Sequence, residues 1–246
     1  MPVFRPAEVD PLASFLRVLP TALGATPRGI LVVSAHWEET RPTLMSGSAP
    51  PLYYDYFGFP PEAYTLSWPA KGDPQLAAQV RELLDSAGLP SSQDPDRGYD
   101  HGTFVPLKLM YPQPTIPVIQ LSLLSGLDPA RHLALGRALA PLRDEGVLIL
   151  GSGMSYHHLP NLMRGRGEAS SRMFDDWLQD AVCGSPQQRA QALLNWQQAP
   201  AARDAHPREE HLLPLLVVAG AAEEAPGQRI FHGTFMDAWI SAFRLG

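Results

Sequence analysis

Three apolar runs of strand length constrain the fold of this chain more than any other feature. They cover residues 29–35, 116–123 and 146–150, and each is rich in Ile, Leu and Val. Apolar runs of this kind are typical of strands that are buried on both faces of a parallel sheet. Because segments with helical spacing alternate with them, the sequence predicts an α/β fold with a largely parallel central sheet.

The segments around these runs carry recognisable helix signals. Asp73 and Pro74 form a typical helix start, and Gly88 is a typical stop. Residues 50–68 are dense in aromatic residues and proline without a clean period, so we predict a long loop that either covers a core edge or lines a pocket. Residues 200–207 are predicted to form another loop. Helices are expected over residues 11–23, 73–88, 104–110, 128–142, 170–182, 186–196 and 209–221.

Composition narrows the class of function. The 246 residues carry a net charge of -6, whereas a nucleic-acid surface needs clustered Lys and Arg. Cys183 is the single cysteine, and the N-terminus lacks a secretory pattern, so we expect a cytoplasmic protein without a disulfide. The longest apolar run, residues 212–222, has only about half the length of a membrane span. We therefore expect a small-molecule protein without a nucleic-acid or membrane partner.

Four of the eight histidines lie at positions where an α/β fold commonly binds its ligand. His36, His157 and His101 follow apolar runs or glycine-containing turns, and His211 begins an apolar segment. The ends of parallel strands are where such sheets present side chains to a ligand. Histidine is the commonest metal ligand and suits proton transfer near neutral pH. The pattern therefore indicates a metal-dependent active site.

The neighbours of these histidines suggest roles and leave alternatives. Asp100 directly precedes His101 and could orient its imidazole, while Gly102 would let a ligand approach the backbone. His157 and His158 are adjacent, so only one of them is expected to enter the site.

His211 follows Glu209 and Glu210 and is either a metal ligand supported by a carboxylate or a polar residue in a first helical turn. His132, His206 and His232 have no comparable context, and we expect surface or structural roles for them. The sequence contains no zinc-finger cysteines, HExxH, GxSxG elbow, P-loop or GxGxxG pattern, so nucleotide binding is unsupported.

An ordered set of motifs between residues 29 and 220 resembles the class III extradiol ring-cleaving dioxygenases, and within them the 4,5-DOPA-dioxygenase-like branch. Each motif is modest alone, but the ordered set is specific. The motifs are SAHWEE, YDYFGFPPEAY, YDHGTFVPLKLMYP, IPVIQLSL, LRDEGVLILGSGMSYH and EHLLPLL. The resemblance implies one catalytic domain over residues 1–246, with a central mixed sheet flanked by helices and a mononuclear metal site at one edge of the sheet.

The resemblance also implies a reaction and roles for individual residues. A small aromatic diol and dioxygen would react at the metal, and the ring would open beside its two hydroxyls. His36 and His211 would be metal ligands, His157 would join them or bind the substrate, and His101 would act as an acid and base. The metal would be Fe(II) in the active form, or Zn(II) as found in relatives. Aromatic side chains of the 50–68 segment would wall the substrate pocket: Tyr53, Tyr54, Tyr56 and Phe57.

One departure from the family pattern qualifies these roles. Members usually have a strand near the N-terminus that ends in a His-Gly pair and supplies a further metal ligand, whereas no histidine precedes His36 in this sequence. We expect either that this strand and its ligand are lost or that the true start lies upstream of this sequence. With one ligand fewer, the site would bind metal weakly or use His157 to compensate. The alternatives are a non-catalytic metal-binding or protein-interacting member of the same fold and, less favoured, a zinc hydrolase. A homo-oligomer stays open.

Overall fold

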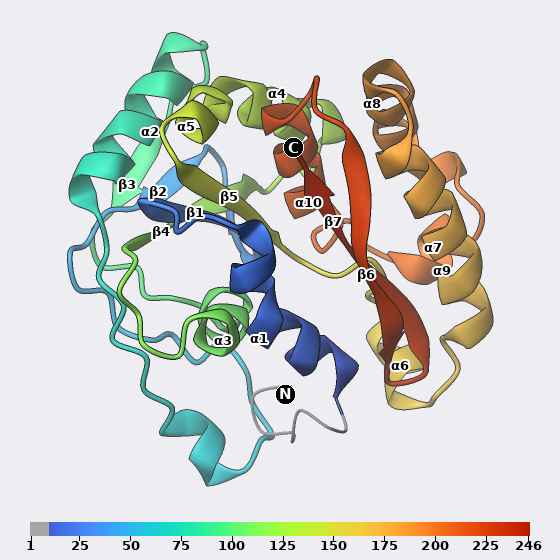
Figure 1. The fold of residues 1–246 in the computed structure, drawn as a ribbon. Helices are drawn as coiled ribbons and strands as arrows, with labels where there is room; N and C mark the ends of the chain where they lie inside the picture. Colours follow the sequence, from blue (N-terminus) through green and yellow to red (C-terminus); the bar gives the residue numbers. More distant parts are fainter. Residues whose placement is uncertain (1–9) are drawn as a thin grey trace. The chain divides into compact units, whose positions relative to one another are not determined.

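The structure, a computed structural model, describes residues 10–246 (Figure 1). The prediction of a missing His-Gly strand concerns residues 1–9 and lies outside the described residues. The contacts divide the chain into two compact units. The first unit runs to Gly126 and adds Pro141–Ser152, and the second comprises Leu127–Ala140 and Gly153–Gly246. The single-domain organisation stays a prediction.

The first unit contains the predicted sheet. Within the described residues it has five strands in the order β3-β2-β4-β1-β5. The central strand β1 pairs in parallel with β4 and β5, and only the β2–β4 pair is antiparallel. The prediction of a mixed, largely parallel α/β sheet is therefore confirmed. The strands are β1 (Gly29–Glu39), β2 (Thr43–Met45), β3 (Ser92–Asp94), β4 (Val118–Leu124) and β5 (Val147–Ser152).

Helices flank this sheet, and their starts follow the capping signals in the sequence. Asp73 accepts hydrogen bonds from the backbone N–H groups of Gln75 and Leu76, and Gly88 adopts a positive φ of 74° after the helix ends. In the view of Figure 1, α1 and α3 lie together below the sheet and α2 and α5 lie above it. The elements are α1 (Pro11–Leu23), η3 (Pro61–Tyr64), α2 (Pro74–Ser86), α3 (His101–Met110) and α5 (Pro141–Asp144).

Two of the boundaries that differ from prediction in the first unit concern site residues. His36 was expected after the end of a strand, but β1 continues to Glu39. The ladder with β5 stops at Ser34, and the register with β4 shifts between Val33 and Glu38, so His36 lies in an irregular part of the strand. His101 was expected on a loop but is the first residue of α3.

The second unit is built from helices and a hairpin, and its C-terminal part was not predicted. The predicted helix 209–221 begins only at Leu213, the predicted 128–142 helix is divided at Ala140, and the expected loop 200–207 contains a short helix. The elements are α4 (Pro129–Leu139), α6 (Leu159–Met163), α7 (Glu168–Cys183), α8 (Pro186–Leu194), η4 (Trp196–Gln198), α9 (Ala202–Ala205), α10 (Leu213–Ala221), β6 (Gly227–Phe235) and β7 (Ala238–Leu245).

Close backbone contact joins α4 to α10 in this unit. A Cβ on Gly136 would lie 2.0 Å from the carbonyl oxygen of Val217, and one on Gly220 would lie 2.2 Å from that of Leu133. Glycine at both positions therefore lets the two helices approach closely. None of the helices in the described part of the chain has the length and apolar character needed to cross a membrane.

His206 is an internal residue of the second unit rather than a surface histidine. It has no exposed surface, its ring lies 5.1 Å from that of Phe174, and its Nε2 is 3.1 Å from the Ser155 carbonyl oxygen. Nδ1 has no hydrogen-bond partner among residues 10–246. The ring is thus neutral, with its hydrogen on Nε2, and burial lowers the pKa of His206 to about 3.

This burial predicts a pH-dependent stability. The pKa of His206 in the folded protein lies below the usual value near 6.5, so the unfolded chain takes up the proton more readily. Stability that the folded protein has above pH 6.5 is therefore lost as the pH falls toward 3. The free energy of unfolding should drop by up to about 1.4 kcal/mol per pH unit in this window. His206→Gln should flatten the slope in urea unfolding between pH 6.5 and 4. Equal slopes in the two proteins would contradict this account.

Candidate functional site

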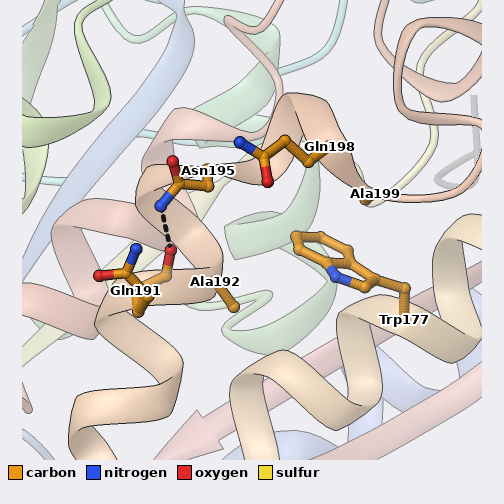
Figure 2. A pocket seen from close by; sticks show the side chains of 6 residues that line it. All are labelled: Trp177, Gln191, Ala192, Asn195, Gln198 and Ala199. Atoms are coloured by element: carbon orange, nitrogen blue, oxygen red, sulfur yellow. Dashed lines mark hydrogen bonds between the residues drawn. The ribbon is translucent and has the colours of Figure 1, made fainter.

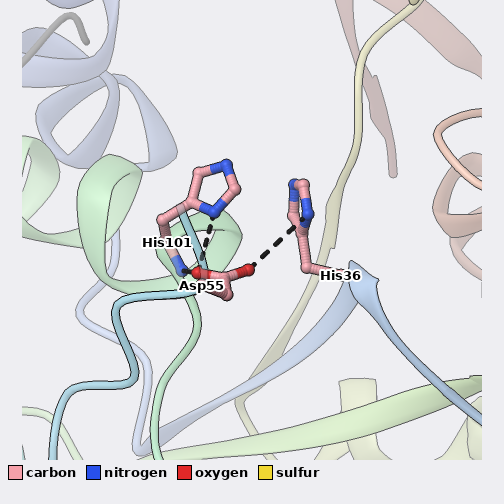
Figure 3. Close-up of side chains that lie close together, drawn as sticks. All are labelled: His36, Asp55 and His101. Atoms are coloured by element: carbon pink, nitrogen blue, oxygen red, sulfur yellow. Dashed lines mark hydrogen bonds and ion pairs between the residues drawn. The ribbon is translucent and has the colours of Figure 1, made fainter. Parts of the chain in front are cut away.

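His36, Asp55 and His101 come together in the first unit from a strand, a loop and a helix (Figure 3). Asp55 Oδ1 accepts a hydrogen bond from the backbone N–H of His101 at 2.8 Å and lies 2.9 Å from Nδ1 of the same residue. Its Oδ2 is 3.7 Å from Nδ1 of His36. The two imidazole centroids are 4.0 Å apart. One carboxylate therefore faces the Nδ1 atoms of two histidines.

Asp55 is ionised in this setting. Burial acts to raise the pKa of its carboxyl, but the hydrogen bond and charge interaction with His101 outweigh burial, and the pKa is lowered from its ordinary value. Asp55 lies within the motif YDYFGFPPEAY, and no role was predicted for it from the sequence. Its position between Tyr54 and Tyr56 could have indicated a role in the site, because the neighbouring tyrosines were predicted to wall the substrate pocket.

Asp100 does not orient His101 as its adjacency suggested. Its buried carboxylate caps α3 through the backbone N–H of Thr103 and accepts hydrogen bonds from the side chains of Ser34, Arg97 and Gln120. Burial raises the pKa of Asp100, against the opposing hydrogen bond from Ser34. Among the described residues, the ring of His101 is held by Asp55 instead.

Gly102 is required by the ring of His36, and its role in the approach of a ligand stays a prediction. A Cβ at this position would lie 2.8 Å from Cδ2 of His36 and 2.8 Å from Oγ of Ser34. Such distances are shorter than any real side-chain contact, so a residue larger than glycine must displace the imidazole or the strand. The start of α3 and the end of β1 are thus fitted to each other at the site.

His157, Glu210 and His211 form a second cluster, which lies in the second unit. Glu210 Oε1 is 2.9 Å from Nδ1 of His211 and 3.5 Å from Nδ1 of His157. The two rings are stacked, with centroids 3.3 Å apart. Burial acts to raise the pKa of Glu210, but hydrogen bonds with both histidines outweigh burial and hold it far below its ordinary value.

Backbone contacts fix both histidines of this cluster. His157 donates its N–H to the carbonyl of Ala205, and Met154 donates to the carbonyl of His211. A Cβ on Gly153 would lie 2.1 Å from that same His211 carbonyl oxygen, so glycine is needed for the approach.

The residues next to this cluster have other contacts. The Nδ1 atom of His158 accepts a hydrogen bond from the Asn161 N–H at the start of α6, as expected if only His157 enters the site. Glu209 pairs with Arg203 at 2.8 Å, so the carboxylate that supports His211 is Glu210.

The donor sets of both clusters fit a metal. In each, two imidazoles and one carboxylate offer ligand atoms within 4.8 Å of one another. Two histidines with one carboxylate suit non-haem iron(II), and the same donors suit zinc. The structure thus brings His36 to His101 and His157 to His211. Because His36 belongs to a different unit from the other two predicted ligands, a single ion shared by His36, His157 and His211 stays a prediction.

The tyrosines expected to bind substrate take different positions in the 50–68 loop. Tyr54 and Tyr56 donate their hydroxyls to the carbonyls of Leu66 and Ala63, and the Tyr56 ring meets the His101 ring edge-on at 5.6 Å. Burial raises the pKa of Tyr56 to about 12. Tyr53 is half exposed and lies under the guanidinium of Arg97. Substrate contact by the three tyrosines stays a prediction.

A cavity of about 400 Å³ in the second unit is lined by none of the residues of the two clusters (Figure 2). It is bounded by α7, α8 and the η4 segment, and none of its lining residues titrates near neutral pH. It therefore offers no acid–base group and no histidine or carboxylate ligand for a metal. The lining residues are Trp177, Gln191, Ala192, Asn195, Gln198 and Ala199.

Comparison with known proteins shows which family this chain is similar to. Residues 9–243 match the family described as the catalytic LigB subunit of aromatic ring-opening dioxygenase. The chain is 39% identical to dioxygenase tasH of Hapsidospora irregularis, over 89% of this chain and 72% of the relative. It is 41% identical to 4,5-DOPA dioxygenase extradiol of Portulaca grandiflora, over 85% of this chain and 78% of the relative.

The fold also matches a solved structure. The crystal structure of an uncharacterized protein from Escherichia coli K12 superposes with a TM-score of 0.80 at 29% sequence identity. The match covers 96% of this chain and 92% of that chain.

The contact at Gly102 predicts the effect of a small substitution. Gly102→Ala should displace the His36 imidazole. If His36 helps to hold a metal ion, the affinity for that ion should fall by about 10–100-fold, since loss of ligand orientation lowers metal affinity to that extent. Calorimetric titration with Fe(II) or Zn(II) measures this affinity. Gly126→Ala is the matched control, because nothing lies within 4 Å of its added Cβ. Equal affinities in the two variants would show that the contact does not position His36.

Proposed function

This chain belongs to the LigB family of class III extradiol dioxygenases, and from that premise we propose that it opens the ring of a catechol-type aromatic substrate with dioxygen. The observation that carries the proposal is the grouping of the four predicted histidines. They gather in pairs around two carboxylates, His36 and His101 at Asp55, and His157 and His211 at Glu210.

We propose that His36, His157 and His211 hold the metal, with iron(II) in the active form or zinc in its place. Glu210 supports this assignment because it faces Nδ1 of His157 and His211. Metal-bound imidazoles commonly direct one ring nitrogen to a carboxylate and the other to the metal. Bound iron(II) would supply open coordination positions at which a catecholate and dioxygen can be brought together.

His101 is the proposed acid and base. A catechol has two hydroxyl protons, and ring opening requires that the second be removed and later returned. His101 has no place in the proposed ligand set and carries a partly exposed imidazole, so it can accept that proton. The anionic Asp55 beside it stabilises the imidazolium that forms.

The aromatic loop around Asp55 supplies the proposed substrate wall. The ring of Tyr56 lies against the ring of His101. The ring centroids of Tyr54 and Phe104 lie 6.1 and 6.3 Å from the ring centroid of Tyr56. Aromatic faces of this kind suit a flat ring substrate and exclude water from the base. Because the hydroxyls of Tyr54 and Tyr56 donate to backbone carbonyls, these two residues are proposed to contact the substrate through their rings.

Oxygen consumption tests the proposal. The protein loaded anaerobically with Fe(II) should consume dioxygen on addition of a catechol, in a one-to-one ratio with the substrate that disappears, and a chelator should abolish uptake. An oxygen electrode and absorbance of the ring-opened product measure the two quantities. Tight metal binding without uptake across a panel of catechols would overturn the proposal and favour the non-catalytic metal-binding alternative.

The role of His101 predicts a separation of metal content from turnover. His101→Ala should keep its metal and lose turnover by about 10²–10⁴-fold, the range typical of general acid–base catalysis. Elemental analysis and steady-state kinetics measure the two effects. His158→Asn is the control, since asparagine can also cap α6. Loss of metal from His101→Ala would mean that His101 is a ligand rather than a base.

A further inference from the structure

We infer that Asp55 is a positioning residue, which holds His101 in the tautomer with its hydrogen on Nδ1 and leaves Nε2 free to take a proton from the substrate. The inference deepens the proposed function and rests on it only for the role of His101 in turnover. The tautomer itself follows from contacts in the first unit.

The contact between His101 and Asp55 identifies the donor of the hydrogen bond. An ionised carboxylate has no hydrogen to give, so the ring nitrogen that faces it at 2.9 Å must be the donor. A neutral imidazole carries a single hydrogen, which is then on Nδ1. In Figure 3 the other ring nitrogen of His101 is directed away from Asp55. The free lone pair is therefore on Nε2, at the far side of the ring.

Asp55 fixes the ring of His101 and the start of α3 together. Oδ1 accepts from both Nδ1 and the backbone N–H of His101, 46 residues away in the sequence. Rotation of the imidazole about its side-chain bonds would break one contact while the other holds the backbone. An acceptor shared in this way fixes both the tautomer and the direction of the ring.

The loop that carries Asp55 is itself anchored. Tyr53 donates its backbone N–H to the carbonyl of Tyr99 at 2.7 Å, just before Asp55. The side chains on either side, Tyr54 and Tyr56, each donate a hydroxyl to a backbone carbonyl further along the loop. Asp55 is therefore held in place on both sides, as a residue that positions a base must be.

Asp55 lies closer to one of its two histidines than to the other. Its Oδ1 is within hydrogen-bond reach of His101, whereas its Oδ2 is 3.7 Å from Nδ1 of His36. The close contact belongs to the proposed base and the longer one to the proposed ligand. Loss of the carboxylate should therefore act first on His101.

The test measures the tautomer directly, in metal-free protein, and turnover separately. In ¹⁵N NMR spectra at a pH where the ring is neutral, wild-type His101 should show its hydrogen on Nδ1, with the resonances assigned by their loss in His101→Gln. Asp55→Asn keeps the size of the side chain but removes its charge, and its amide can donate as well as accept. The Nε2-protonated form should then become substantially populated.

In the Fe(II)-loaded enzyme, Asp55→Asn should lower kcat by about 10²-fold or more, while KM for the catechol changes little. The lost interaction serves proton transfer rather than binding, and an asparagine in place of an orienting aspartate is known to favour the wrong tautomer. Glu62→Gln makes the same chemical change on the same loop, where the carboxylate is exposed, and should behave as wild type in both measurements.

Each outcome decides the inference. An unchanged tautomer in folded Asp55→Asn overturns it whether or not the protein is active. A changed tautomer with unchanged kcat overturns the link to proton transfer. If wild-type protein shows no turnover at all, the proposed function fails, but the NMR comparison still decides whether Asp55 sets the tautomer. Circular dichroism confirms folding, and Asp55→Ala provides a second variant in which no acceptor remains.

Discussion

The contact between one carboxylate and two imidazoles is the interaction on which the rest of the candidate site depends. Removing Asp55 or Glu210 from water is unfavourable, and the ring N–H groups that face each carboxylate offset that cost. In return the carboxylate fixes which face and which nitrogen each imidazole presents. The rings are thus oriented by the protein alone, so that a metal or substrate meets groups already in position.

Much of the fold could be predicted because its signals are local. The apolar runs became β1, β4 and β5, and Asp73 caps α2 as its sequence position indicated. The hairpin β6–β7 was missed because its turn residues, Met236 and Asp237, adopt positive φ angles of 49° and 64° without a glycine. A two-residue turn of this kind is normally recognised by Asn-Gly or Asp-Gly, and that signal is absent here.

The site was predictable in its residue types but not in its pairings. The positions of the four histidines in the sequence identified them, and family resemblance supplied their roles. The structure groups them in pairs that no spacing rule predicts. Asp100 was assigned to His101 because it is adjacent in sequence, but a helix N-cap turns its side chain toward the first amides of its own helix. Asp55 was overlooked because its partner is 46 residues away, and only tertiary structure brings them together.

The shared oxygen of Asp55 has a consequence for motion. Because the start of α3 and the imidazole of His101 are tied to the same loop atom, any opening of that loop releases both at once. The ordering of the loop and the orientation of the His101 imidazole are then one equilibrium rather than two. Opening of the loop would therefore leave the imidazole of His101 without the contact that orients it.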